Sequence, residues 1–286
     1  MTRTHHKIGQ CTLFILFILI SNASLIAQSI WTTGTRDNSM SFEYDRPSFK
    51  SSAFNFSGAA YLLSGDFSIG ENTSLVLQLP FASGSMPSQT YTYPGFSFSE
   101  PGISQNGVGN PYIGIEKKIK YSESFFEIGF RPPVASESNS FALAVGTFGD
   151  LDQMEAFGPD YLYLQAIGNY KKTFENGFTI RGRIGPDVWI KTKSSAGGNS
   201  VEVVLAYSLQ PGYIGESFEI LAGYSGRMNA TVDVQNFSDR FLEQVGLSAA
   251  AHLAEFRPGV EFRLPVDKNL RQWIDYTYGF FLAVDF

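Results

Sequence analysis

The sequence has little of the chemistry that enzymes and redox proteins use. It contains one cysteine, Cys11, and three histidines, of which His5 and His6 lie near the N-terminus. Cys11 precedes the apolar run 13–20, whereas the cysteine of a lipoprotein follows such a run, so a lipid anchor is not expected. If this N-terminal segment is removed, disulfides, thiolate metal sites and cysteine nucleophiles are all excluded.

Basic residues are also scarce. The chain has 21 Lys and Arg against 27 Asp and Glu, a net charge of −6. Removal of residues 1–27 takes away Arg3 and Lys7 and leaves 19 − 27 = −8. Such a balance argues against nucleic acid as a partner, since nucleic-acid binding requires a basic surface. After Ala27 no apolar run is long enough for a membrane-spanning helix, so a membrane protein of this sequence must be a closed barrel.

The N-terminus has the pattern of a signal peptide. Basic residues precede the apolar run 13–20, and small and polar residues follow it. We expect cleavage after Ala27, which divides the chain into a signal peptide, 1–27, and an exported domain, 28–286. An uncleaved anchor is the alternative, but the run is too short to span a bilayer.

Alternation of apolar and polar residues runs through the exported part. Phe126, Ile128 and Phe130, for example, alternate with Glu127 and Arg131. This period of two predicts strands with one face to lipid and the other to a lumen. The fold class expected is all-β, a transmembrane antiparallel up-and-down barrel of about 12 strands, with 10 or 14 as alternatives. The strands are predicted near 39–46, 54–69, 74–82, 110–120, 124–134, 161–173, 178–190, 200–212, 218–228, 254–265 and 270–286, with the weakly patterned 241–250 as the twelfth.

The predicted connections differ in length. Short polar turns are expected at 70–73, 121–124, 175–177, 215–217 and 267–269, where Asn and Gly suit tight hairpins. Long segments fall at 83–108, 135–160 and 229–250. Short periplasmic turns with long external loops are typical of outer-membrane barrels, although a soluble β-sandwich has the same alternation.

The last predicted strand favours the barrel over the sandwich. Its outward face is apolar throughout: Ile274, Tyr276, Tyr278, Phe280, Leu282, Val284 and Phe286. In a soluble protein such a terminal edge invites aggregation. The strand resembles the C-terminal signal that the barrel-assembly machinery recognises. We therefore expect location in the outer membrane of a Gram-negative cell, with outer-membrane lipids and, through the strand ending at Phe286, the assembly machinery as partners.

Three stretches resemble a known family of outer-membrane barrels. They are 61–81 (YLLSGDFSIGENTSLVLQLPF), 107–117 (GVGNPYIGIEK) and 131–133 (RPP). The order of these stretches resembles that in the outer-membrane transporters of the phenol meta-cleavage pathway. Those transporters are barrels similar to the long-chain fatty-acid channel. The resemblance implies a barrel that transports small hydrophobic compounds. It departs from the family at Asn110, where an acidic residue is usual.

Few residues suggest catalysis or metal binding. His252 is the only histidine after the N-terminal segment, and Ser248 lies four residues before it in a poorly patterned stretch. A hydrolase would need the two within hydrogen-bond reach and oriented by a third group. Asp150, Asp152 and Glu155 could offer oxygen ligands to calcium, but calcium needs six to eight. We expect no enzyme activity, no cofactor and no metal.

Charged residues of both signs fall on the predicted lumen face, where buried charges need partners. The predicted lumen-lining residues are Glu116, Lys118, Glu127, Arg131, Arg181, Arg183, Asp187, Glu202, Glu219, Arg227, Glu261, Arg263 and Asp275. They could form a polar constriction or simply hold a plugged barrel together.

The segment 135–160 carries an apolar run that includes Phe141, Leu143 and Val145. Such a run needs apolar shelter, so it is predicted to fold into the barrel mouth as a lid. The alternative is a strand that extends beyond the membrane.

The function predicted from these features is a passive channel or facilitator for small molecules of unidentified nature. The alternative is a non-transporting barrel of a surface or secretion assembly.

Overall fold

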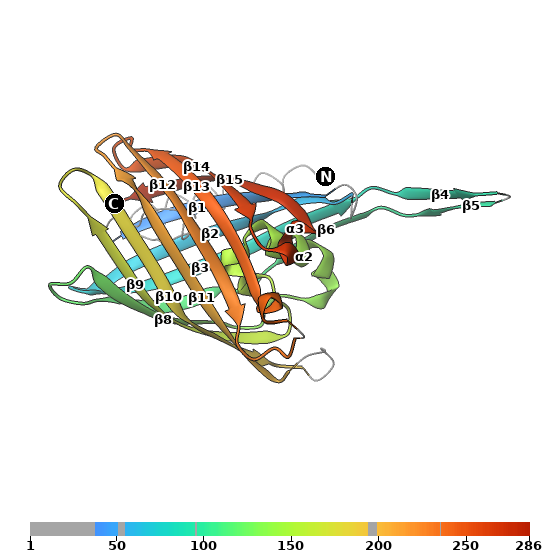
Figure 1. The fold of residues 1–286 in the computed structure, drawn as a ribbon, viewed down its shortest axis with the longest axis horizontal. Coiled ribbons are helices and arrows are strands. Elements are labelled where there is room, and N and C mark those ends of the chain that lie inside the picture. The colour runs from blue at the N-terminus through green and yellow to red at the C-terminus, as the bar shows by residue number, and fades with distance from the viewer. Residues whose placement is uncertain (1–37, 51–54, 95, 194–198, 235) are drawn as a thin grey trace, which may run out of the picture.

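A computed structural model describes residues 38–286, except 51–54, 95, 194–198 and 235. The predicted signal peptide, 1–27, lies outside the described residues. The fold is a closed antiparallel barrel of 12 strands, as the alternation predicts (Figure 1). The barrel strands are β1 (Asn38–Phe49), β2 (Ser57–Gly70), β3 (Thr73–Met86), β7 (Tyr112–Lys118), β8 (Ser124–Arg131), β9 (Tyr161–Thr173), β10 (Phe178–Lys191), β11 (Val201–Ile214), β12 (Phe218–Asn229), β13 (Phe241–Ala251), β14 (Phe256–Pro265) and β15 (Ile274–Asp285).

The first and last strands close the barrel. β1 pairs with both β2 and β15, and every further pairing in the wall joins barrel strands that follow one another in the chain. One neighbour pairing is divided. β3 pairs with β7 along its first half and with β6 (Ile103–Val108) along its second half. The strand that faces β3 is interrupted at residues 109–111, which separate β6 from β7. The weakly patterned segment 241–250 is the twelfth strand, β13, so that prediction is confirmed.

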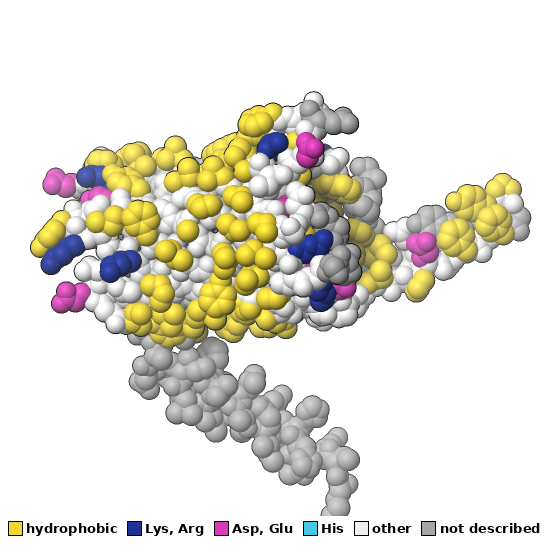
Figure 2. Space-filling model, turned by 90° about the horizontal axis from the view of Figure 1, so that it is seen from below, with side chains coloured by type: hydrophobic (Ala, Val, Ile, Leu, Met, Phe, Trp, Pro, Cys, Tyr) yellow, Lys and Arg dark blue, Asp and Glu magenta, His cyan; other side chains and the backbone are white. Residues whose placement is uncertain are grey.

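The outer surface of the barrel is apolar. Apolar side chains are exposed there, among them Ile128 (66%) and Phe280 (54%), which the alternation predicts to face lipid, and Leu79 (47%). Figure 2 shows the resulting apolar belt, with charged side chains gathered toward the two ends. No helix in the described ranges is long and apolar enough to cross a bilayer.

The two ends of the barrel differ. One end, the short-turn end, carries the tight connections after β2, β7, β9, β11 and β13, and there the Phe286 amide donates to the Asn38 carbonyl. The other, the long-loop end, carries the remaining connections. The predicted turn at 267–269 belongs to the long-loop end, so its assignment to the short-turn series is wrong. Asp267 caps a helical turn there, α3 (Lys268–Arg271), instead of closing a hairpin.

Two parts depart from the barrel wall. The hairpin of β4 (Gln89–Tyr93) and β5 (Phe96–Glu100) projects from the long-loop end (Figure 1). The connection between β8 and β9, residues 132–160, instead folds into the barrel mouth, and we call it the plug. It contains a 3-10 turn (Glu137–Asn139), helix α2 (Ser140–Gly149) and a second 3-10 segment, η2 (Leu151–Ala156). A further 3-10 turn, Phe237–Arg240, precedes β13.

Candidate functional site

The plug packs against the inner wall of the barrel through its apolar run. Ala142 and Leu143 of α2 are at most 1% exposed. They belong to a buried cluster with three other plug residues and with the wall residues Ala60, Leu62 and Ala82. The run 141–145 therefore forms a helix inside the lumen, because the small wall residues of β2 and β3 leave room for it.

Glycines bring α2 close to the wall. A Cβ at Gly149 would lie 2.9 Å from the Ala60 Cβ, and one at Gly146 would lie 2.9 Å from the Ala82 Cβ. Real Cβ atoms do not approach other atoms so closely, so only glycine fits the present spacing. The wall is thus shaped to receive this helix.

Arg263 holds the end of α2. From β14 it donates to the Asp150 carboxylate at 2.8 Å and also contacts Asp45 (2.7 Å) and Glu261 (2.6 Å). Glu43, Asp45 and Asp150 are the one group of three acidic side chains in the described ranges that lie close enough to share a metal ion. Because the guanidinium already contacts two of them, these carboxylates are better explained as its partners than as metal ligands.

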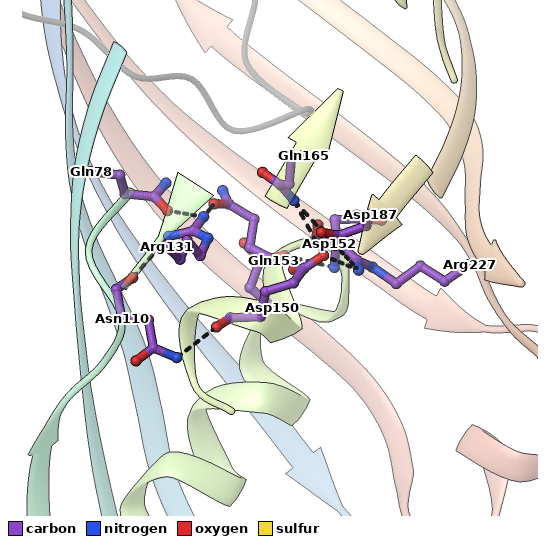
Figure 3. Close-up of polar contacts among 10 residues, drawn as sticks. Gln78, Asn110, Arg131, Asp150, Asp152, Gln153, Gln165, Asp187 and Arg227 are labelled. Atoms are coloured by element: carbon purple, nitrogen blue, oxygen red, sulfur yellow. Dashed lines mark hydrogen bonds and ion pairs between the residues drawn. The ribbon is translucent and has the colours of Figure 1, made fainter. Parts of the chain in front are cut away.

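Arg227 holds the second half of the plug (Figure 3). From β12 it forms an ion pair with Glu155, donates to the Asp152 carbonyl and lies 3.4 Å from Asp187. The Asp152 carboxylate accepts from Gln244 at 2.6 Å. The acidic residues that the sequence offered as calcium ligands therefore anchor the plug to arginine and amide partners.

Asn110 binds both ends of the plug. Its side-chain amide donates to the carbonyls of Glu155 (3.0 Å) and Gly158 (2.6 Å), while its side-chain oxygen accepts from the amides of Val134 and Ala135. It is fully buried, at the break between β6 and β7. An aspartate at this position could not make the two donations, so this attachment of the plug requires the amide.

Arg131 completes this attachment. It donates to the Asn110 carbonyl (3.0 Å), to Gln78 (2.6 Å) and to Gln153 of the plug (2.9 Å), as Figure 3 shows. Its guanidinium also lies 5.0 Å from the ring centre of Tyr112. Two of the stretches that resemble the family, 107–117 and 131–133, thus contribute Asn110 and Arg131 to the anchoring of the plug, beside Arg227 and Arg263.

A polar cavity of about 300 Å³ lies on the short-turn side of the plug. It extends from Asp152 and Gln153 to the β7–β8 turn at residues 122–124. Six predicted lumen residues line it: Glu116, Lys118, Glu127, Arg131, Arg181 and Arg183. Tyr112 is among the other lining residues and donates to Glu127 at 2.6 Å. This chamber could hold water and polar solutes.

A second cavity, of about 240 Å³, lies on the long-loop side of the plug and is lined by apolar residues alone. Four phenylalanines form a chain of edge-to-face contacts along it, with ring centres 4.9–5.7 Å apart. The lining consists of Phe49, Phe56, Phe141, Ala144, Val145, Phe148 and Trp273. We call it the aromatic pocket. Its walls suit a small apolar molecule, since a cavity of roughly 150 Å³ already accommodates benzene.

The remaining predicted lumen and lid residues lie at several places around the plug. Asp187, Arg227, Glu261 and Arg263 belong to the ion-pair clusters at the plug. Glu202 accepts from Asn229 at 2.7 Å. Phe141 and Val145 line the aromatic pocket, whereas Leu143 packs on the wall.

Two of the predicted lumen-lining residues, Glu219 and Asp275, lie near the barrel ends. The buried Glu219 lies 3.4 Å from His252, so the nearest acidic partner of this histidine is a lumen carboxylate. Asp275 does not line the lumen. It is exposed and 3.8 Å from Lys50. The register of β1 and β15 shifts at Phe49, and Ile274 is buried inside instead.

Sequence reasoning did not find the roles of Asn110 and Gln78. One feature of the sequence could have indicated the role of Asn110. It lies in Gly109-Asn110-Pro111, which interrupts an otherwise regular strand pattern. A polar residue at such a break can turn away from the strand ladder and bind another segment.

No family model and no curated protein matches the sequence. Solved structures do match. An outer membrane channel from Pseudomonas putida F1 aligns with 91% of this chain and 100% of its own, at 10% identity and a TM-score of 0.55. The translocator domain of the autotransporter NalP from Neisseria meningitidis aligns with 99% of this chain and 96% of its own, at 11% identity and a TM-score of 0.52. The chain has an outer-membrane barrel fold. At such identities the likeness establishes the fold, and the apolar belt agrees with a place in the outer membrane.

Proposed function

We propose that this barrel is a passive channel for small apolar compounds and that the plug is its gate. The observation that carries the proposal is the pair of cavities on opposite sides of the plug. The aromatic pocket lies toward the long loops, which face the cell exterior in outer-membrane barrels, and the polar cavity lies toward the short turns. A solute captured outside would reach the inner chamber when the plug shifts.

The apolar character of the cargo rests on the aromatic pocket and agrees with the family resemblance. Binding there can be measured with naphthalene as the probe, because Trp273 lines the pocket and its fluorescence should respond. Ala144→Phe should fill the pocket and abolish the response. Ser104→Phe adds the same ring to an exposed position of β6 and should leave it unchanged. Equal responses in both variants would contradict an apolar binding site in this pocket.

Transport needs a separate measurement. Vesicles with lipopolysaccharide in the outer leaflet resist apolar dyes, so dye entry through the purified protein can be recorded. We expect entry with the unmodified chain and loss of entry with Ala144→Phe. If the unmodified chain binds naphthalene but does not admit the dye, the barrel does not transport and the alternative of a non-transporting barrel is favoured. The tight anchoring of the plug is the structural observation that supports this alternative.

A further inference from the structure

Three nitrogen atoms in the wall of the polar cavity are buried and have no hydrogen-bond partner among the described residues. They are Nε of Arg183, Nδ2 of Asn169 and Nε2 of Gln210. All three side chains line the cavity, and Gln210 is only 1% exposed. Native proteins leave few buried donors unpaired, so three of them at one cavity indicate that a further group accepts from them.

The three residues come from neighbouring strands, β9, β10 and β11. Arg183 lies directly opposite Asn169, and Gln210 lies opposite Arg181. Arg181 is two residues from Arg183 and therefore on the same face of the sheet. Side chains at such paired and diagonal positions start roughly 5–8 Å apart, so one small solute group can contact all three donors.

This part of the wall is also positively charged. The residues of β9, β10 and β11 that line the cavity include three basic side chains, Lys171, Arg181 and Arg183, and no acidic one. Lys171 and Arg181 interact electrostatically with Glu219 of β12. Arg183, in contrast, forms no ion pair with any carboxylate in the part of the chain that the structure describes. Its guanidinium is therefore available to a solute.

An anion fits these donors better than water or a neutral solute does. Each unpaired atom donates and none can accept, so the complementary group has several acceptor atoms and a negative charge. The planar fork of the Arg183 guanidinium matches the two oxygens of a carboxylate.

The rest of the cavity limits the charge of the ligand. Five acidic side chains line it beside its five basic ones, and Glu116 of β7 and Glu127 of β8 are among them. These carboxylates repel a group with two negative charges, such as sulfate, more strongly than a singly charged carboxylate. The volume of about 300 Å³ restricts the ligand to a small molecule.

We propose that the β9–β11 wall of the polar cavity binds the carboxylate group of a small organic acid. The carboxylate accepts from the Arg183 guanidinium and from the side-chain amides of Asn169 and Gln210. This site and the aromatic pocket lie on opposite sides of the plug. The site therefore binds its ligand whether or not the barrel transports apolar compounds.

The test uses the purified full chain in micelles of a non-ionic detergent at pH 7, with calorimetry as the readout. Benzoate is the probe, and benzamide, which has nearly the same shape but no charge, is its matched comparison. We expect saturable binding of benzoate by the unmodified chain. Sulfate should bind at least about tenfold more weakly than benzoate, because of its second charge.

A filled aromatic pocket separates this site from the proposed function. In Ala144→Phe, benzoate should keep its affinity within about twofold. Benzamide should bind this variant at least about tenfold more weakly than benzoate, because only the charged group matches the donors. Failure of naphthalene to bind the aromatic pocket would leave both expectations unchanged.

Two substitutions remove the proposed contacts. Gln210→Glu keeps the shape of the side chain but replaces the buried donor with an oxygen, and Arg183→Gln removes the positive charge. Each should weaken benzoate binding about tenfold or more. Lys120→Gln removes an exposed positive charge outside the cavity and should leave benzoate binding within about twofold. Circular dichroism verifies that each variant folds.

Four results would overturn the proposal. The first is absence of saturable benzoate binding by the unmodified chain. The second is loss of benzoate binding in Ala144→Phe, or equal affinity of this variant for benzoate and benzamide. The third is unchanged benzoate affinity in Gln210→Glu or in Arg183→Gln. The fourth is tighter binding of sulfate than of benzoate, since the donors would then serve an inorganic anion.

Discussion

The guanidinium of Arg263 lies 2.8 Å from the carboxylate of Asp150, which is 113 residues away in the sequence. This contact joins the strand β14 to the end of helix α2, and both side chains are about 2% exposed. A buried ion pair contributes less net stability than its Coulomb energy, but removal of one partner is costly. The pair therefore fixes the position of the plug inside the barrel.

Asp150→Ala should loosen the plug without unfolding the barrel. Arg263 keeps Asp45 and Glu261 as partners, so the loss should be roughly 1–3 kcal/mol and confined to the plug. We expect faster swelling of vesicles in sucrose than with the unmodified chain. Asp275→Ala removes an exposed carboxylate at the rim and should leave swelling unchanged. Equal swelling of the two variants would show that Arg263 does not control the plug.

Asn110→Asp should release both ends of the plug. The carboxylate cannot donate to the carbonyls of Glu155 and Gly158 and would oppose their partial negative charge. Each unsatisfied buried group costs roughly 1–3 kcal/mol. We expect protease to cut residues 132–160 in the folded variant. Asn199→Asp, in an exposed loop, is the control. An uncut plug in Asn110→Asp would contradict the assigned role of this amide.

The barrel could be predicted from the sequence because alternation fixes which side chains face lipid. Ile128 and Glu127 fall on opposite faces in any antiparallel barrel, whatever its loops do. Even β13 was found, from the requirement for an even strand number. The turn at 267–269 was misassigned because a short polar segment can cap a helical turn as well as close a hairpin.

The plug could be predicted only in outline. The apolar run at 141–145 indicated a need for shelter, but its helix depends on the small residues Ala60 and Ala82 of distant strands. The ion pairs of Arg227 and Arg263 depend on register across several strands. Asp275 was misplaced by a single shift at Phe49, because a one-residue slip moves a side chain to the other face.

Gly149→Val should displace α2 from the wall. The first added carbon would lie 2.9 Å from the Ala60 Cβ and 3.1 Å from the Asp45 carbonyl oxygen. Overpacking of this kind costs roughly 1–3 kcal/mol. We expect faster sucrose entry into vesicles and weaker naphthalene binding, because Phe148 moves with the helix. Gly182→Val, where no atom lies within 4 Å of an added Cβ, is the control and should match the unmodified chain.

Arginine at the middle of the lipid-facing belt should destabilise the barrel far more than arginine in the polar cavity. Ile128 lies in the central part of β8 and is 66% exposed on the outer surface, whereas Ser208 of β11 lines the polar cavity. A charge near the bilayer midplane of a barrel costs roughly 2–4 kcal/mol, because lipid offers it neither water nor a counterion. Ser208→Arg enters a wet chamber that already contains carboxylates such as Glu127.

The difference can be measured as the free energy of unfolding in urea, with the protein folded into phosphatidylcholine vesicles. Ile128→Arg should lower this free energy by roughly 2–4 kcal/mol, and Ser208→Arg by less than about 1 kcal/mol. Ile220→Arg, on the outer face of β12, extends the test to a second strand. Equal losses for Ile128→Arg and Ser208→Arg would mean that the two faces do not differ in environment, and the assignment of lipid and lumen faces would then be wrong.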